Sequence, residues 1–148
     1  MSNRSHLPGL APEAYGALRA VEAVIAESGL ERRLLELVKI RASQINGCAF
    51  CLDMHSRAAR DAGETAQRLD VLAGWHEAPF YTERERAALA WTERLTRLAS
   101  DGAPEGGPAA LAAQFSDQEI GFLTAAVGMI NLWNRVVLGL GVLPPVRS

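Results

Sequence analysis

Apolar residues recur at helical spacing along most of this chain, and the apolar–polar alternation typical of strands is nearly absent. The chain has 148 residues, a length that suits one domain, and 49% of them are hydrophobic, which is ample for a buried core. We therefore expect an all-α fold and a single domain over residues 1–148, with its core at about 12–140. Residues 1–8 are expected to form a polar N-terminal tail, and residues 141–148 a proline-containing end.

Two capping boxes mark the starts of two helices. Thr82 with Glu85 opens one, and Ser116 with Glu119 opens the other. Asn46 is a good N-cap for the helix that carries the cysteines. Helices are therefore expected at about 12–28, 31–45, 46–63, 64–74, 82–98 and 116–139, with a short helical turn at 109–114 and loops at 75–80 and 101–108.

The last expected helix is apolar on nearly every side. Its apolar residues are Phe122, Leu123, Val127, Met129, Ile130, Leu132, Trp133, Val136, Val137 and Leu138. Such a helix must be buried all round, and burial at a subunit interface is the easier solution for a domain of this size, so we expect a homo-oligomer. Asn131, Asn134 and Arg135 share one side of the helix, where they bond across a subunit interface, line a pocket or form an ordinary polar stripe.

Charge and hydropathy argue against several classes of protein. The net charge is −2 and the pI about 5.9, so no basic surface argues for nucleic acid as a partner. The polar N-terminus lacks the apolar segment of a signal peptide, and no run of about 18 apolar residues is free of a charge or an amide, so we expect no membrane span. The expected location is the reducing cytoplasm, where a close cysteine pair is more often catalytic, redox-active or metal-binding than a structural crosslink.

The two cysteines of the chain stand three residues apart, and a histidine follows one helical turn later, in Cys48-Ala49-Phe50-Cys51 and His55. At about 100° per residue, the thiols and the imidazole fall within an arc of about 60° on one side of a helix. Charged residues occupy the opposite side, so the three reactive groups are predicted to lie on the buried face. A dithiol beside a proton carrier in a shielded place indicates thiol redox chemistry.

Three features favour reaction at this dithiol. The helix N-terminus places partial positive charge near Cys48, His55 can accept or relay a proton, and the spacing lets one sulfur capture the other after oxidation. If Cys51 became a sulfenic acid, Cys48 could condense with it to a disulfide, which an external reductant would then reduce. Two other interpretations stay open, a zinc site and a pair of buried cysteines that act as small hydrophobic residues. The zinc ligands would be Cys48, Cys51 and His55, with Glu36 or His76 as the fourth.

The sequence from Glu36 to His55 resembles the alkylhydroperoxidase AhpD family, within the carboxymuconolactone decarboxylase-like superfamily. The family pattern is a glutamate, a CxxC motif twelve residues later and a histidine four residues after the second cysteine, and all four positions match. The resemblance implies an all-α helical bundle of the AhpD type, usually assembled as a trimer or hexamer. It also implies a peroxidase, whose dithiol reduces hydroperoxides without a metal or an organic cofactor.

The resemblance implies a role for each matched residue. Cys51 would be the peroxidatic residue that forms a sulfenic acid, and Cys48 the resolving residue and proton donor, so that a Cys48–Cys51 disulfide forms. Glu36 and His55 would be the proton relay. A lipoyl-bearing protein or another dithiol would be the reductant, and we expect it to reach Cys48 from the solvent side. Phe50 stands where the best-known members have a histidine.

Glu36 is the residue whose assignment depends on the resemblance. A helical projection puts it with Arg32 and Lys39 on the polar side of its helix, where it would be an ordinary solvated glutamate. The family pattern instead turns this side of the helix towards the cysteines. Glu36 is then expected to be partly buried and to contact His55 directly or through water.

Several other functions remain as alternatives. They are a protein disulfide reductase at the same site, a decarboxylase or isomerase of the wider superfamily, a non-enzymatic zinc or redox-sensing module, and a protein that keeps the fold for assembly alone. A decarboxylase needs an acid–base site rather than a dithiol, so the cysteine pair favours the redox interpretation.

The remaining tryptophans and histidines are expected to have structural or peripheral places. Trp75, Trp91 and Trp133 are expected in the core or at an interface. His6 is expected in a mobile tail, and His76 in a surface loop.

Overall fold

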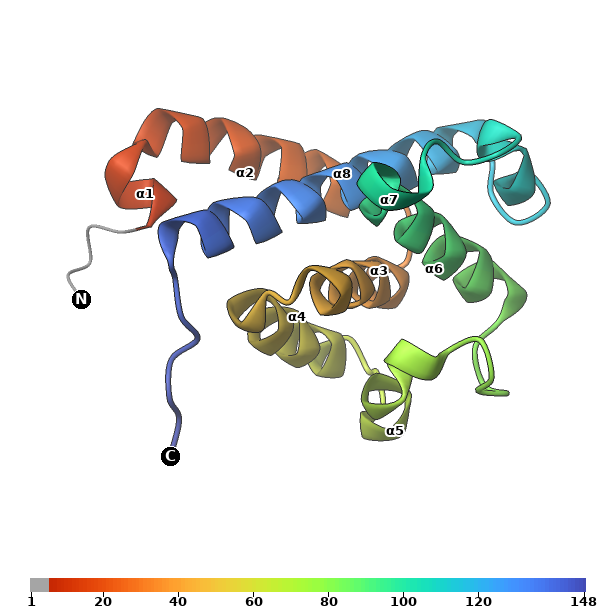
Figure 1. Ribbon diagram of the computed structural model, residues 1–148, viewed down its shortest axis with the longest axis horizontal. Coiled ribbons are helices and arrows are strands. Elements are labelled where there is room, and N and C mark those ends of the chain that lie inside the picture. The colour runs from red at the N-terminus through yellow and green to blue at the C-terminus, as the bar shows by residue number, and fades with distance from the viewer. Residues whose placement is uncertain (1–5) are drawn as a thin grey trace.

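The computed structural model describes residues 6–148, which form an all-α fold (Figure 1). Its α-helices are α1 (Leu7–Leu10), α2 (Pro12–Ala26), α3 (Arg32–Asn46), α4 (Ala49–Asp61), α5 (Ala66–Asp70), α6 (Glu83–Thr96), α7 (Leu98–Asp101) and α8 (Asp117–Leu140). Two short 3-10 helices are η1 (Leu72–Gly74) and η2 (Gly107–Leu111). No strand occurs among the described residues, and the predicted fold class is confirmed. The long helices begin and end within three residues of their expected bounds, while the expected helix at 64–74 is divided into α5 and η1.

Helix α3 lies at the centre of the structure. It packs against α4, α6 and α8, and most of its residues from Leu34 to Ser43 are buried. Figure 1 shows α2 and α8 side by side on one side of α3, with α4 beside α3 below them. Helix α3 therefore joins α4, α6 and α8, while α2 packs against α8 and α1 against α2.

Within a single chain α8 is only partly buried, so its burial on every side stays part of the homo-oligomer prediction. Its buried residues are Leu123, Ala126, Val127, Met129, Ile130 and Asn134. Leu138, near the end of the helix, is 49% exposed. The helix that is buried nearly all round is α3, because it has neighbours on three sides. In the described part of the chain, α8 is the one helix long and apolar enough to cross a membrane. The core helix of a helical bundle meets the same two criteria of length and composition.

A left-handed turn at Gly47 joins α3 to α4. Gly47 has φ +70°, a backbone conformation that favours glycine, and it follows the last residue of α3. The prediction that Asn46 caps α4 is wrong, since Asn46 ends α3 and Cys48 is the N-cap of α4. The backbone N–H of Cys51 donates to the Cys48 sulfur at 3.4 Å. The first cysteine of the motif therefore caps the helix that carries the second.

Both predicted capping boxes are present. Thr82 and Glu85 form reciprocal side chain-to-backbone hydrogen bonds at the start of α6, and Ser116 and Glu119 do the same at the start of α8. Residues 141–148 contain no helix or strand, as their prolines predicted. These two starts are therefore specified locally, by side chains within four residues of one another.

Two glycines with equal free space test the importance of the Gly47 turn. A methyl group at Gly47 or at Gly16 would meet nothing within 4 Å, but only Gly47 has a positive φ. We expect Gly47→Ala to lower the free energy of unfolding by about 1–2 kcal/mol, because alanine is strained in the left-handed region. Gly16→Ala, within α2, should raise it by about 0.5–1 kcal/mol. Urea unfolding of both variants checks this, and an equal effect of the two substitutions would contradict it.

The homo-oligomer stays a prediction, for which exposed apolar side chains on α2 and α8 offer a test. Val21 is 42% exposed, Val24 57% and Leu138 49%. We expect sedimentation velocity to give a trimer or hexamer, because association would remove such side chains from water. Val24→Asp should shift the protein towards smaller species. A wild-type monomer at micromolar concentration would contradict the prediction.

Candidate active site

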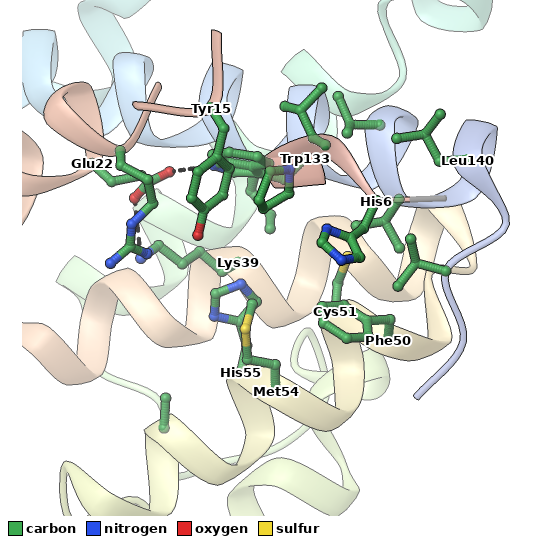
Figure 2. Close-up of a pocket in the computed structure, with 18 of the residues that line it drawn as sticks. His6, Tyr15, Glu22, Lys39, Phe50, Cys51, Met54, His55, Trp133 and Leu140 are labelled. Carbon is green, nitrogen blue, oxygen red and sulfur yellow. Dashed lines mark hydrogen bonds and ion pairs between the residues drawn. The ribbon is translucent and has the colours of Figure 1, made fainter. Parts of the chain in front are cut away.

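A cavity of about 540 Å³ lies between α1, α2, α3, α4 and α8. Cys51 and His55 from α4 line it (Figure 2), and so does Glu36 from α3. Much of the remaining wall is apolar, and α8 contributes Ile130, Val136, Val137 and Leu140. The cavity therefore combines a reactive wall with space for an apolar molecule.

The two cysteines form a disulfide, as the resemblance implied, but they differ in their access to the cavity. Both are almost fully buried, Cys48 at 0% exposed and Cys51 at 1%, but Cys51 lines the cavity and Cys48 is not part of its wall. The expectation that a reductant reaches Cys48 from the solvent is therefore wrong. The reason is that Cys48 occupies the N-cap position beneath the first turn of α4, against α3 and its turn.

Glu36 contacts His55 directly, and this expectation is confirmed. The distance from Glu36 Oε2 to His55 Nδ1 is 2.8 Å. The Glu36 side chain is 9% exposed and the His55 side chain 12%. The turn at Gly47 folds α4 back along α3 and so brings together two residues from different helices.

Three influences act on the pKa of the Glu36 carboxyl group. Burial raises the pKa, but the hydrogen bond from His55 and the positive charge of Lys39 lower it, and the net pKa lies below the ordinary value of 4.5. Glu36 is therefore ionised at neutral pH. An ionised carboxylate only accepts hydrogen bonds, so His55 donates from Nδ1 and its Nε2 remains for proton transfer.

A row of charged side chains extends the wall beyond Glu36, and sequence reasoning missed its role. Lys39 Nζ lies 3.7 Å from Glu36 Oε1 and 3.7 Å from Glu22 Oε2. Trp133 Nε1 donates to Glu22 Oε1 at 2.9 Å, and the Tyr15 ring meets the Trp133 ring edge-on at 6.0 Å. The signal that could have drawn attention to the row is that Lys39 is the only lysine in the chain.

Sequence reasoning misplaced His6 and missed part of the role of Trp133. His6 lines the cavity together with the first residues of α1, so it does not belong to a tail. Of the expected tail at 1–8, residues 1–5 lie outside the described residues, and residues 7–8 begin α1. Trp75 is buried in the core and Trp91 and Trp133 pack against it, as expected, but Trp133 also lines the cavity.

The zinc interpretation receives no support from the arrangement of ligands. His76 lies at the surface, as predicted, with Nε2 3.3 Å from Glu93 Oε2. Across residues 6–148, no group of three or more His, Cys, Asp or Glu side chains is placed to hold a metal ion. Glu36, the other suggested fourth ligand, bonds instead to His55.

The amides of α8 bind α3 rather than a partner subunit or a ligand. Asn46 Nδ2 donates to Asn131 Oδ1 and to Asn134 Oδ1, both at 2.9 Å. Asn134, which is fully buried, donates to Ser43 Oγ at 3.0 Å. Arg135 is exposed and bonds back to Asn131. The polar side of α8 therefore fixes α8 against the end of α3, close to the turn that precedes Cys48.

A sequence model of the Carboxymuconolactone decarboxylase family matches residues 12–94, more than half of the chain. The chain belongs to this family. The match runs from α2 into α6 and so contains Glu36, both cysteines and His55.

One protein sequence and one crystal structure match nearly the whole chain. The uncharacterized protein YdfG of Bacillus subtilis is 37% identical over 141 residues, covering 95% of this chain and 96% of that protein. A crystal structure of an Agrobacterium tumefaciens protein of unknown function, described as a candidate antioxidant defence protein AhpD, has a TM-score of 0.89 and 45% identity. That comparison covers 95% of this chain and 96% of the other. The AhpD-like helical bundle is thereby confirmed.

Two further matches carry the names of two activities. Alkyl hydroperoxide reductase AhpD of Streptomyces coelicolor is 38% identical over 86 residues, which cover 55% of this chain and 48% of that protein. The debrominase Bmp8, solved with 2,3,4-tribromopyrrole, has a TM-score of 0.81 at 18% identity, covering 95% of this chain and 74% of that one. That likeness shows the fold alone, and a fold does not fix the reaction, which is argued from the residues of this chain.

The lowered pKa of Glu36 predicts how its contribution to stability depends on pH. Because its pKa is lower in the folded protein than in the unfolded chain, the carboxylate stabilises the fold above about pH 4.5, and this stabilisation is lost as the pH falls through the folded pKa. We expect Glu36→Gln to lower the free energy of unfolding by about 1–3 kcal/mol at pH 7, the range for a hydrogen bond to a charged group. At pH 3.5 the free energies of unfolding of Glu36→Gln and the wild type should be closer to each other.

Urea unfolding of the oxidised protein at the two pH values measures this difference. Glu13→Gln, on the exposed side of α2, is the matched control and should have little effect at either pH. An equal loss for Glu36→Gln at both pH values would contradict the charge argument.

Proposed function

We propose that this protein reduces organic hydroperoxides with the Cys48–Cys51 dithiol. The observation that carries the proposal is that Cys51 lines an apolar cavity beside the hydrogen-bonded pair of His55 and Glu36. Membership of the Carboxymuconolactone decarboxylase family and the similarity to AhpD proteins support it at a coarser level.

The first step oxidises Cys51. Its thiolate attacks the terminal oxygen of the hydroperoxide, an S–O bond forms, and the O–O bond breaks. Cys51 loses two electrons and becomes a sulfenic acid, while the other oxygen leaves as an alcohol after it takes a proton. His55 Nε2 takes the proton of the Cys51 thiol and then gives it to that oxygen, while Glu36 accepts the hydrogen bond from Nδ1–H and so holds the ring in place.

The second step joins the two cysteines. The Cys48 sulfur attacks the sulfenic sulfur of Cys51, an S–S bond forms, and hydroxide leaves as water with the proton of the Cys48 thiol. The Cα atoms of the pair are 5.3 Å apart and Cys48 caps the helix of Cys51, so the sulfurs meet without rearrangement of α4. The positive end of the helix favours the thiolate form of Cys48 in this step.

The third step needs an external dithiol. One of its thiolates attacks Cys51, because Cys48 is buried away from the cavity, and Cys48 leaves as the thiolate. The second thiol of the reductant then closes its own disulfide and frees Cys51. A slim arm such as a lipoyl group fits such an approach, whereas the disulfide of a folded protein substrate does not, since both sulfurs are buried. This access argues against the protein disulfide reductase.

The wall of the cavity favours an organic hydroperoxide over hydrogen peroxide. Phe50 and Met54 from α4 and the apolar side chains of α8 face the same space as Cys51 (Figure 2). Burial of an apolar group contributes about 25 cal/mol for each Å² removed from water, a gain that hydrogen peroxide cannot provide. Acid–base chemistry at Glu36 and His55 alone, as in a decarboxylase, would make no use of the disulfide.

Thiol titration and intact mass test the proposal. The reduced protein is treated with one equivalent of cumene hydroperoxide. We expect the loss of two thiols, a decrease in mass of about 2 Da, and reversal by dihydrolipoamide, because the dithiol is converted to a disulfide and back. Hydrogen peroxide should react more slowly. Two thiols that stay unreacted would overturn the proposal.

Three variants assign the roles. Cys51→Ser should be inert, whereas Cys48→Ser should retain the oxygen as a sulfenic acid, with a gain of about 16 Da that dimedone traps. His55→Ala should slow the oxidation about 100-fold, the scale of a lost general acid. If the Cys48 thiol of Cys51→Ser were oxidised at the wild-type rate, Cys48 would be the peroxidatic residue and Cys51 the resolving one.

A further inference from the structure

Lys39 is a chemical exception within this chain. The chain has 15 lysines and arginines, and Lys39 is the only lysine. It is also placed between two carboxylates in the wall of the cavity, with Nζ 3.7 Å from Glu22 Oε2 and 3.7 Å from Glu36 Oε1 (Figure 2). An ammonium group is a compact point charge that acts equally on carboxylates to either side, whereas a guanidinium binds one carboxylate best through its planar edge.

The surroundings of Lys39 hold this charge in place. The Lys39 side chain is 16% exposed and that of Glu22 is 18% exposed. Trp133 fixes Glu22 from the other side with the hydrogen bond from its indole N–H. Partly buried charges are screened less by water and salt than exposed ones. The net charge of Glu22, Lys39 and Glu36 therefore acts on groups in the cavity.

We propose that Lys39 is a positioning residue whose charge offsets the two carboxylates of the cavity wall and thereby favours the thiolate form of Cys51. The Glu22–Lys39–Glu36 row carries a net charge of about −1 with Lys39, and about −2 without it, counting ionised groups at neutral pH. A second uncompensated negative charge opposes formation of another anion in the same cavity. The inference rests on the proposed function only for the identity of Cys51 as the reacting thiol.

The other charged and titratable groups that face the cavity come from each element around it. They are His6 before α1, Tyr15, Arg19 and Glu22 on α2, Glu36 and Lys39 on α3, and His55 on α4. Arg32, outside the cavity wall, also acts on Glu36 through its charge. The part of α8 that lines the cavity contributes no titratable group. Only Lys39 forms ion pairs with both carboxylates, so its removal changes the charge next to His55 and Cys51 most directly.

The pH dependence of alkylation tests the inference without a hydroperoxide. In a Cys48→Ser background Cys51 is the one remaining thiol, and neutral iodoacetamide reports its thiolate. We expect Lys39→Met to shift the pH midpoint of the alkylation rate upward by about half to one unit, which slows the reaction at pH 7 about three- to tenfold. An unchanged midpoint in Lys39→Met would overturn the inference.

Compensating variants separate charge from shape. Glu22→Gln keeps an acceptor for the Trp133 N–H but removes one negative charge, so it should shift the midpoint downward. Combined with Lys39→Met, it should return the midpoint to the parent value, and Lys39→Arg should also stay near that value. Glu27→Gln, at the C-cap of the same helix and outside the cavity wall, is the matched control and should not shift the midpoint.

Two outcomes would overturn the inference even if Lys39→Met alone behaves as expected. One is an upward shift of the midpoint in Lys39→Arg as large as that in Lys39→Met. The other is a midpoint in the double variant that stays above the parent value. Either would make the shape of the side chain, rather than its charge, responsible. If Lys39→Met does not fold, Glu22→Gln decides: a downward shift supports the inference, and an unchanged or raised midpoint overturns it. A protein that alkylates as expected but leaves cumene hydroperoxide unreduced would contradict the proposed function and leave the role of Lys39 standing.

Discussion

The left-handed turn at Gly47 determines where every reactive group of the cavity lies. It ends α3 and starts α4 with Cys48 as the cap, so α4 runs back along α3. Glu36 and His55, far apart along the chain, thereby come within 2.8 Å of each other. A longer connection would free Cys48 from the cap and change which sides of the two helices face each other. The CxxC motif and the hydrogen-bonded pair of Glu36 and His55 therefore depend on the same few backbone angles.

Helix α8 keeps that arrangement fixed and also completes the cavity. Near the turn, its buried amides bond to Asn46 and Ser43 of α3. In the same turn of α8, Trp133 contributes an apolar ring to the cavity wall and donates its indole N–H to Glu22. Buried polar groups are costly unless all are paired, and in the described residues no buried side-chain nitrogen or oxygen lacks a partner. The polar side of an otherwise apolar helix is therefore the part that orients it.

The sequence predicts what is decided within a turn or two of helix and misses what is decided between helices. The two capping boxes, the long helices and the place of His76 are specified by near neighbours, and they are confirmed. The burial of Glu36 could be predicted only through the family pattern, because periodicity shows that a side of α3 is polar but not that α4 covers it. The hydrogen bonds of Asn134 and Trp133 could not be predicted for the same reason, since their partners, Ser43 and Glu22, lie on other helices.

The unequal access of the two sulfurs constrains the proposed reaction cycle. Cys51 lines the cavity and Cys48 does not, so the hydroperoxide and the reductant must reach the same sulfur through the same space. A cavity of about 540 Å³ is of the size that holds one drug-sized ligand, so the two reactants bind in turn rather than together. Oxidation then leaves the protein in the disulfide form, the alcohol departs, and only afterwards does the dithiol bind and reduce the disulfide, which is the order of a ping-pong reaction. The apolar wall that favours an organic hydroperoxide must, on this argument, also accept the carbon chain of the dithiol that follows it.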